Sequence, residues 1–320
     1  MNRKLFLVLL FVITTICAFA QTHRNEFGLQ TDNDSYLLRG GDNYYTDGVF
    51  LYYRHALKVK GDYNTHLQNK IFGLELGQKI FNPQTGMIPA AKYVDRPFAG
   101  YLYVGSTLNL LYKNESNLKL GAQLGVVGPA SGAQTAQEFV HNTFGFYHIT
   151  GWQYQIKNDL ELNLSAEYNK LLARGALLDM SVSAYGNLGT GFTGAGVGPL
   201  FRFGNFNQLF NSASTQSTVI AAARVTPLHQ HEFFFYYKPQ LNYVGYDATV
   251  QGGLFEKHNQ PDSEEIVRVP EPLMFSNELG LTYTTNRWVL GFTAIFHSRD
   301  TKVMIYTHQW GSITAIYRLN

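Results

Sequence analysis

Residues 159–169 read DLELNLSAEYN. Side chains alternate between the two faces of a β-strand, so the leucines, Ala166 and Tyr168 share one face, while the acidic and amide residues share the other. This segment is longer than the about 5 to 6 residues that are usual in globular sheets. It matches the about 9 to 11 residues of a tilted strand that crosses a membrane.

The same alternation recurs along the chain, as in residues 233–243, 275–284 and 288–297. A soluble β-sandwich also alternates, with its apolar faces turned inward. Alternation alone therefore leaves two folds open, a membrane barrel and a secreted sandwich.

Three features favour the barrel. The strands are long, the chain ends on a strand (residues 312–319) that could pair with the first one, and aromatic residues gather near strand ends, where interfacial girdles belong. These aromatic residues are Tyr101, Tyr103, Tyr236, Tyr237, Trp310 and Tyr317. The sequence therefore predicts an all-β fold, a transmembrane antiparallel β-barrel that forms a single domain over residues 21–320.

The first residues have the pattern of a cleaved signal peptide. Arg3 and Lys4 precede an apolar run, and Ala18-Phe19-Ala20 forms a small-x-small cleavage site. We therefore expect residues 1–20 to be removed on export. The one cysteine, Cys17, lies among them, so neither a disulfide nor a thiol nucleophile is expected in the mature chain.

The charge of the mature chain is close to balanced. Removing the signal peptide takes away two of the 25 basic residues and none of the 23 acidic ones. This balance argues against nucleic acid as a partner. The ten histidines show no ligand spacing such as H-E-x-x-H, so no zinc site is predicted.

A polar cluster stands where the first two strands would meet. Asn33-Asp34 is followed at a short distance by residues 44–48, which read Tyr-Tyr-Thr-Asp-Gly. A carboxamide, a carboxylate and a hydroxyl placed together can bind a hard cation and polarise an ester carbonyl. We therefore take Asn33, Asp34 and Thr46 as candidate site residues.

Residues 133–142 break the β pattern and contain helix formers, which predicts a short helix or turn. On a helix, Gln137 and His141 would project from the same face. A histidine near a cation site can take a proton from water and direct the hydroxide onto an ester. A loop histidine that makes a single hydrogen bond is the plainer alternative.

Several motifs in order resemble the LpxR-type lipid A deacylase family. They are Asn33-Asp34, Tyr45-Thr46-Asp47-Gly48, residues 95–103 (DRPFAGYLY), residues 124–129 (LGVVGP) with Gln137 and His141, Gly151-Trp152 with Gln155, and Tyr185-Gly186-Asn187. The resemblance covers most of the mature chain. It implies a barrel of about twelve strands in the bacterial outer membrane, which hydrolyses the ester of the 3′-acyloxyacyl group of lipid A with a divalent cation, usually Ca²⁺.

The resemblance also implies roles for single residues. Asn33 and Asp34 would lie in the cation and oxyanion region, with Asp34 as the metal ligand. Thr46 would line the same pocket, and His141 would be the general base with Gln137 beside it. The partner would be lipid A, or lipopolysaccharide, in the outer leaflet of the membrane, and the protein would act as a monomer.

Two further residues are candidates for substrate binding. Arg96 matches the family's Asp-Arg pair and could face a lipid A phosphate, or could equally brace the barrel interior through Asp95. Tyr147 stands six residues after His141, where some family members carry a glutamate that is thought to support catalysis. This departure leaves open what supports the base.

Three alternatives remain at this point. Thr46 could be a nucleophile that forms a covalent acyl-enzyme. A calcium-dependent outer-membrane phospholipase could use the same chemistry on glycerophospholipids. A non-enzymatic pore would explain the alternation, with Glu161, Glu167 and Glu278 lining a channel.

Overall fold

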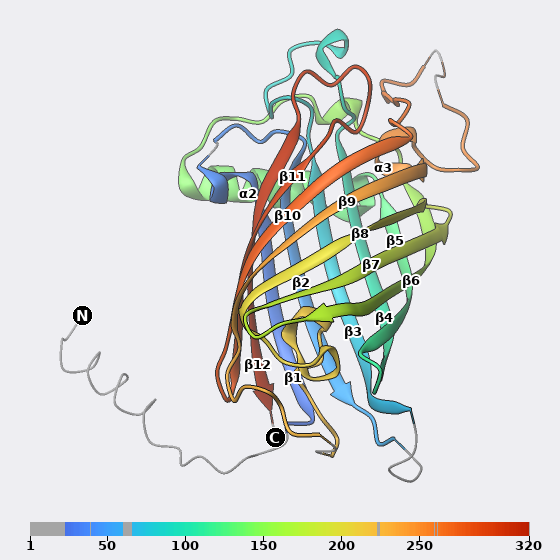
Figure 1. Cartoon of the computed structure of the whole chain (residues 1–320). Coiled ribbons are helices and arrows are strands. Elements are labelled where there is room, and N and C mark those ends of the chain that lie inside the picture. The colour runs from blue at the N-terminus through green and yellow to red at the C-terminus, as the bar shows by residue number, and fades with distance from the viewer. Residues whose placement is uncertain are drawn as a thin grey trace, which may run out of the picture.

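The computed structural model describes residues 23–38, 40–59, 66–222, 225–258, 260 and 262–319. They form a closed antiparallel barrel whose last strand, β12, pairs with β1 (Figure 1). The predicted antiparallel barrel and its closure by residues 312–319 are confirmed. The predicted signal peptide, residues 1–20, lies outside the described residues.

Twelve strands make up the barrel wall within the described residues. They are β1 (Asn25–Asn33), β2 (Tyr45–Ala56), β3 (Leu67–Phe81), β4 (Ala99–Tyr112), β5 (Ser116–Val127), β6 (Asp159–Arg174), β7 (Leu178–Gly189), β8 (Phe192–Asn205), β9 (Phe233–Asp247), β10 (Leu273–Thr284), β11 (Trp288–His297) and β12 (His308–Leu319). Every strand pairs with its neighbours in sequence, as in an up-and-down barrel.

On β6 the apolar face points outward and the polar face points into the barrel, the reverse of the arrangement in a soluble protein. Leu160, Leu162 and Leu164 are exposed on the outer surface, whereas Glu161 and Asn163 are buried. A hydrocarbon environment stabilises such an apolar exterior, and closure of the sheet leaves no edge without hydrogen bonds. No helix among the described residues is long and apolar enough to cross a bilayer.

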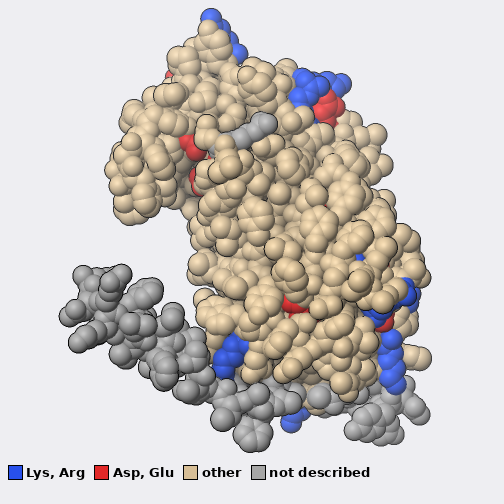
Figure 2. Space-filling model, turned by 60° about the vertical axis from the view of Figure 1, so that its left-hand side comes forward, with Lys and Arg blue, Asp and Glu red and all other residues tan. Residues whose placement is uncertain are grey.

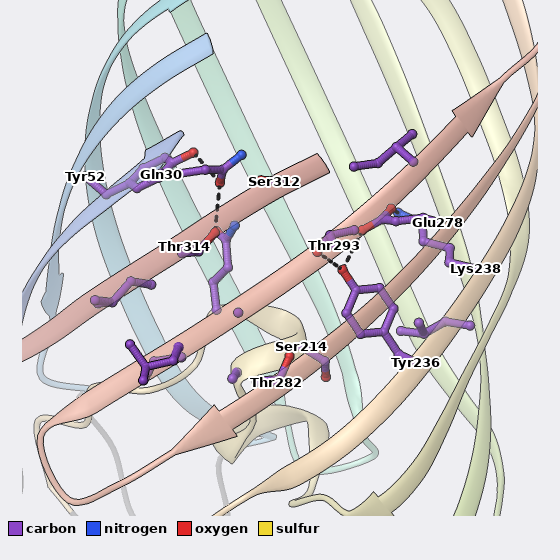
Figure 3. A pocket seen from close by; sticks show the side chains of 18 of the residues that line it. Gln30, Tyr52, Ser214, Tyr236, Lys238, Glu278, Thr282, Thr293, Ser312 and Thr314 are labelled. Carbon is purple, nitrogen blue, oxygen red and sulfur yellow. Dashed lines mark hydrogen bonds and ion pairs between the residues drawn. The ribbon is translucent and has the colours of Figure 1, made fainter. Parts of the chain in front are cut away.

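The lumen holds a polar cavity of about 410 Å³ (Figure 3). In it, the Tyr236 hydroxyl lies 2.8 Å from Glu278 and 2.9 Å from Thr293, and Lys238 lies 3.9 Å from Glu278. On the opposite wall, the Tyr52 hydroxyl donates to Gln30. These interior polar side chains therefore bind one another between nearby strands of the wall.

The prediction of an aromatic girdle is wrong for several of its residues. Tyr101 and Tyr103 are buried inside the barrel, where their rings stack with centroids 4.9 Å apart. Tyr236 and Trp310 line the lumen cavity. The reason is the polar tip of these side chains, which finds partners such as Asn163 and Glu75 in the interior.

The segment between β8 and β9 enters the end of the lumen that is far from α2 (Figure 1). It contains η5 (Leu209–Asn211) and η6 (Ala213–Thr215). Phe210 and Val219 pack against Ile71 and Leu111, and the Asn109 side chain donates to the Thr215 carbonyl at 2.8 Å. This plug, residues 206–220, therefore closes that end with packed side chains.

The opposite end carries the short helices. They are η1 (Asp34–Leu37), η2 (Ala91–Tyr93), η3 (Pro129–Ser131), α2 (Ala133–Phe144), η4 (Trp152–Tyr154) and α3 (Ala248–Gln251). The predicted helix over residues 133–142 is confirmed as α2. It packs against the outside of the wall at Gly100, where an added Cβ would lie 2.2 Å from the Ala133 Cβ. Glycine at this position allows the close approach.

Candidate active site

The site begins with a cross-strand pair on the outer face of the wall. Asn33 at the end of β1 lies opposite Asp47 on β2. Their side chains lie on the same outer face as those of Leu29 on β1 and Val49 on β2, which are exposed. The Asn33 side-chain nitrogen donates to Asp47, and its oxygen accepts from the Ser35 backbone amide at 2.7 Å, which caps η1. Asn33 therefore fixes both the carboxylate and the turn that follows.

Asp34 opens η1 and is buried. Its carboxylate accepts a hydrogen bond from the Asn43 backbone amide at 2.9 Å. Burial, together with the nearby carboxylates of Asp42 and Asp47, raises the pKa of Asp34 to about 7 despite this bond. A cavity of about 190 Å³, lined by Asp34, Asn43, Tyr306, Thr307 and Gln309, opens beside it.

The loop from η1 to β2 holds Asp42 in a strained backbone. Leu38, Asp42 and Tyr44 have φ values of 60°, 46° and 62°, in the left-handed region that non-glycine residues rarely occupy. Asp42 accepts hydrogen bonds from the Thr46 hydroxyl at 3.1 Å and from the Tyr147 hydroxyl. The loop therefore places a third carboxylate beside Asp34 and Asp47.

His141 reaches this carboxylate from α2. Its Nδ1 donates to the Tyr147 backbone carbonyl at 2.8 Å, which places the ring proton of the neutral imidazole on Nδ1. Its Nε2 lies 3.0 Å from the Asp42 carboxylate. The early loop and the mid-chain helix thus meet at a His141–Asp42 contact.

Gln137 and Thr46 contribute in different ways. Gln137 is buried on the same face of α2, where its side-chain oxygen accepts from Trp152 Nε1 at 3.1 Å. Its side-chain nitrogen has no hydrogen-bond partner among the described residues. Thr46 is fully buried and contacts Asp42 rather than His141, so the carboxylate lies between the hydroxyl and the imidazole.

A family model described as "Outer membrane protein LpxR" matches residues 5–319. The chain belongs to the LpxR family. The structure of LpxR from Salmonella typhimurium resembles this LpxR-family barrel with a TM-score of 0.73 and 19% identity, over 92% of this chain and 100% of that one. At this identity the likeness shows the fold.

Two other solved structures are more distant from this LpxR-family protein. The β domain of the Bordetella autotransporter BrkA has a TM-score of 0.45 at 10% identity, over 94% of this chain and 100% of that one. The KdgM porin has a TM-score of 0.39 at 8% identity, over 92% and 99% of the two chains. No curated protein sequence matches the chain.

Arg96 of this LpxR-family protein lies inside the barrel and not at the outer site. Its guanidinium lies 2.9 Å from Asp300, donates to the Thr249 hydroxyl at 3.0 Å, and stacks 4.2 Å from the centroid of the Phe81 ring. The side chain is 1% exposed. This geometry favours the bracing role, with Asp300 as the partner instead of Asp95.

Sequence reasoning missed Asp42 and gave Asp47 no role. Asp47 stands in the Tyr-Thr-Asp-Gly motif. Pairing of the first two strands places it opposite Asn33, and this pairing could have identified it as a site residue. Asp42 belongs to a turn-rich stretch whose composition predicts only a loop. Tyr147, proposed as a substrate-binding residue, instead contacts Asp42 through its hydroxyl. Burial raises the pKa of this hydroxyl, and Asp42 raises it further, so it remains a donor.

Proposed function

We propose that this protein is an outer-membrane lipid A deacylase that hydrolyses the ester of the 3′-acyloxyacyl group, with His141 as the base and a divalent cation held near Asp34. Membership of the LpxR family supports the reaction class. The observation that carries the proposal is the contact of His141 with Asp42, beside Asp34 and Asp47, on the outside of the wall.

The outward position suits a lipid substrate. Asn33 and Asp47 stand at the upper ends of rows whose lower members, Leu29 and Val49, face hydrocarbon. A lipid can therefore keep its acyl chains in the bilayer while one ester reaches the polar groups. A site inside the lumen would require the whole lipid to leave the membrane.

The contacts of His141 define its role. The Tyr147 carbonyl holds the proton on Nδ1, so Nε2 is the basic nitrogen. Nε2 lies 3.0 Å from the Asp42 carboxylate, so the attacking water would reach Nε2 when this carboxylate turns aside. His141 would take the water proton on Nε2, and the Asp42 carboxylate would stabilise the imidazolium. Hydrogen bonds from the Thr46 and Tyr147 hydroxyls orient the Asp42 carboxylate.

The side chains fit a hard divalent cation. Asp34, Asp42 and Asp47 interact electrostatically with one another, and their oxygens are the ligand type that Ca²⁺ prefers. Burial is the main cause of the raised pKa of Asp34, and this crowding of negative charge, which a cation would relieve, adds to it. When bound there, a divalent cation would polarise the ester carbonyl.

Removing divalent cations is expected to abolish fatty-acid release. Chelation with EDTA would leave the three carboxylates without their counter-charge, and adding Ca²⁺ back should restore activity. Fatty acid released from lipid A in vesicles, measured by mass spectrometry, checks this expectation. Unchanged release after chelation and dialysis would remove the cation from the mechanism.

The Asp42→Asn variant is expected to lower kcat by about 10- to 100-fold, since a hydrogen bond to a charged group contributes about 1.5 to 3 kcal/mol. The substitution keeps the shape of the side chain but removes the charge that stabilises protonated His141. Asp262→Asn, at an exposed loop position, is the matched control. Normal kcat in a folded Asp42→Asn variant would show that the contact has no part in turnover.

Thr46→Val is expected to retain measurable turnover, because the hydroxyl orients Asp42 and the water attacks the ester directly. A covalent route would instead acylate Thr46. Peptide mass spectrometry after reaction with lipid A distinguishes the two. An acyl group on the peptide that contains Thr46 would establish the covalent route and refute direct attack by water.

Mass spectrometry of lipids from cells that express the protein tests the function itself. Loss of the 3′-acyloxyacyl group from lipid A is the expected result. Lysophospholipid would identify a phospholipase, and unchanged lipids would favour the non-enzymatic barrel. The plug formed by residues 206–220 argues against an open pore, because it fills one end of the lumen.

A further inference from the structure

The outer face of α2 and the residues just after it expose a group of large apolar side chains. Phe139, Phe144 and Phe146 are 69%, 70% and 60% exposed, and Val140 beside them is also exposed. We call these four residues the aromatic shelf. The rings of Phe144 and Phe146 stack on each other, with centroids 6.0 Å apart. An exposed apolar cluster of this kind marks an interaction surface more often than scattered apolar residues do.

The shelf lies directly above the lipid-facing part of the wall. On β3, the outward row runs from exposed Leu74 and Leu76 to Gln78, whose side chain donates to the Ser131 carbonyl at 2.7 Å. The next outward residue, Ile80, is buried under the α2 region. At about 3.3 Å per residue, the helix therefore begins within two residues of side chains that contact hydrocarbon.

The neighbouring strand, β4, places α2 at the same distance from the lipid-facing side chains. On β4, the outward residue Val104 is exposed, and Gly100 on the same row touches Ser131 and Ala133. The upper part of the molecule overhangs the wall, and the overhanging surface in Figure 2 shows no Lys or Arg. The shelf is therefore continuous with the established membrane-facing surface of the barrel.

The charge of α2 indicates which layer of the membrane it meets. The helix contains no Lys or Arg, and its one acidic residue, Glu138, accepts a hydrogen bond from Gln134. A helix that bound lipid phosphates would carry basic residues on its exposed face. Aromatic and aliphatic side chains without such charges suit the acyl-chain layer just below the headgroups.

We propose that the aromatic shelf inserts into the acyl-chain layer of the outer leaflet and thereby sets the depth of the active site. His141 and Gln137 lie on the buried face of the same helix, and the Phe146 ring contacts the His141 ring edge to face at 5.5 Å. A helix held at this depth places His141 near the boundary of headgroups and acyl chains, where a lipid ester lies. The second half of this inference rests on the proposed deacylase function.

Site-directed spin labelling tests the insertion independently of activity. The one native cysteine, Cys17, lies in the expected signal peptide, so Phe139→Cys and Phe144→Cys in a chain that begins at Gln21 each give a single label. Leu164→Cys on the wall of β6 serves as the lipid reference, and Asn286→Cys in the β10–β11 turn serves as the water reference. The barrel is reconstituted in phosphatidylcholine vesicles, and collision rates with O₂ and with a water-soluble nickel chelate are measured.

Labels at positions 139 and 144 are expected to match the Leu164 reference, with frequent O₂ collisions and few nickel collisions. Collision rates like those at position 286 would overturn the proposal, whatever the activity of the protein. If the labels are inserted but lipid A is unchanged in the expressing cells, the deacylase function fails and the membrane contact stands.

A double variant tests the link to catalysis. Phe139→Ser with Phe144→Ser removes the apolar contact but leaves His141 and its partners in place. We expect at least about tenfold slower hydrolysis of lipid A in vesicles, since the two serines remove apolar surface that would hold the helix in the acyl-chain layer. Hydrolysis in detergent micelles should be nearly unchanged. Equal losses in both, or no loss in either, would show that the shelf does not set the depth of the site.

Discussion

His141→Ala is expected to reduce fatty-acid release from lipid A by about 10² to 10⁴-fold, the usual contribution of a positioned general base. The variant removes Nε2, which faces Asp42, and Nδ1, which donates to the Tyr147 carbonyl. No other histidine is seen in contact with Asp42 in the described part of the chain. Mass spectrometry of lipid A after incubation with the reconstituted barrel measures the loss.

His148→Ala is the matched control for this result. His148 is exposed and lies seven residues further along the chain, so its removal should leave the rate unchanged. Circular dichroism and the heat-modified gel mobility of a folded barrel establish that both variants fold. A folded His141→Ala protein with near-normal turnover would exclude His141 as the base.

Asp34→Asn is expected to have the second large effect, a loss of about 10² to 10³-fold in kcat, comparable with removing one preorganised stabilising group. Asparagine keeps an oxygen that can accept from the Asn43 amide, so the η1 turn should persist. The variant lacks the negative charge next to Asp42 and Asp47 that would hold the cation.

The same variant should lose the stabilising effect of Ca²⁺. A ligand that binds only the folded state raises Tm, and more so the tighter it binds, so Ca²⁺ should raise the Tm of the parent protein and of Glu256→Gln, an exposed acidic control. It should leave the Tm of Asp34→Asn nearly unchanged. An equal rise in all three proteins would place the cation elsewhere.

Period-two alternation predicted the barrel wall because burial on one face of each strand is set locally. Leu160, Leu162 and Leu164 share a face because side chains alternate along a strand. In a membrane barrel this apolar face points outward to lipid, whereas in a soluble sheet it would point inward. The same parity could have corrected the aromatic girdle. Tyr101 and Tyr103 fall on the row opposite to exposed Val104, so they point inward.

From the sequence, only those site residues that belong to recognisable motifs could be predicted. Asn33, Asp34 and His141 belong to recognisable patterns, whereas Asp42 lies in a loop whose contacts depend on three left-handed residues and on a helix about 100 residues later. The partner of Arg96 is equally remote, since Asp300 lies 204 positions away. Such pairs arise from tertiary packing, which local spacing does not encode.

The plug of residues 206–220 gives the barrel a use that differs from that of a porin. Because Phe210 and Val219 fill one end of the lumen, the wall encloses a space that is closed at that end, and the candidate site lies on the outer flank of the wall. A bacterium can therefore carry many copies of this protein in its outer envelope without opening a route for nutrients or toxins to pass.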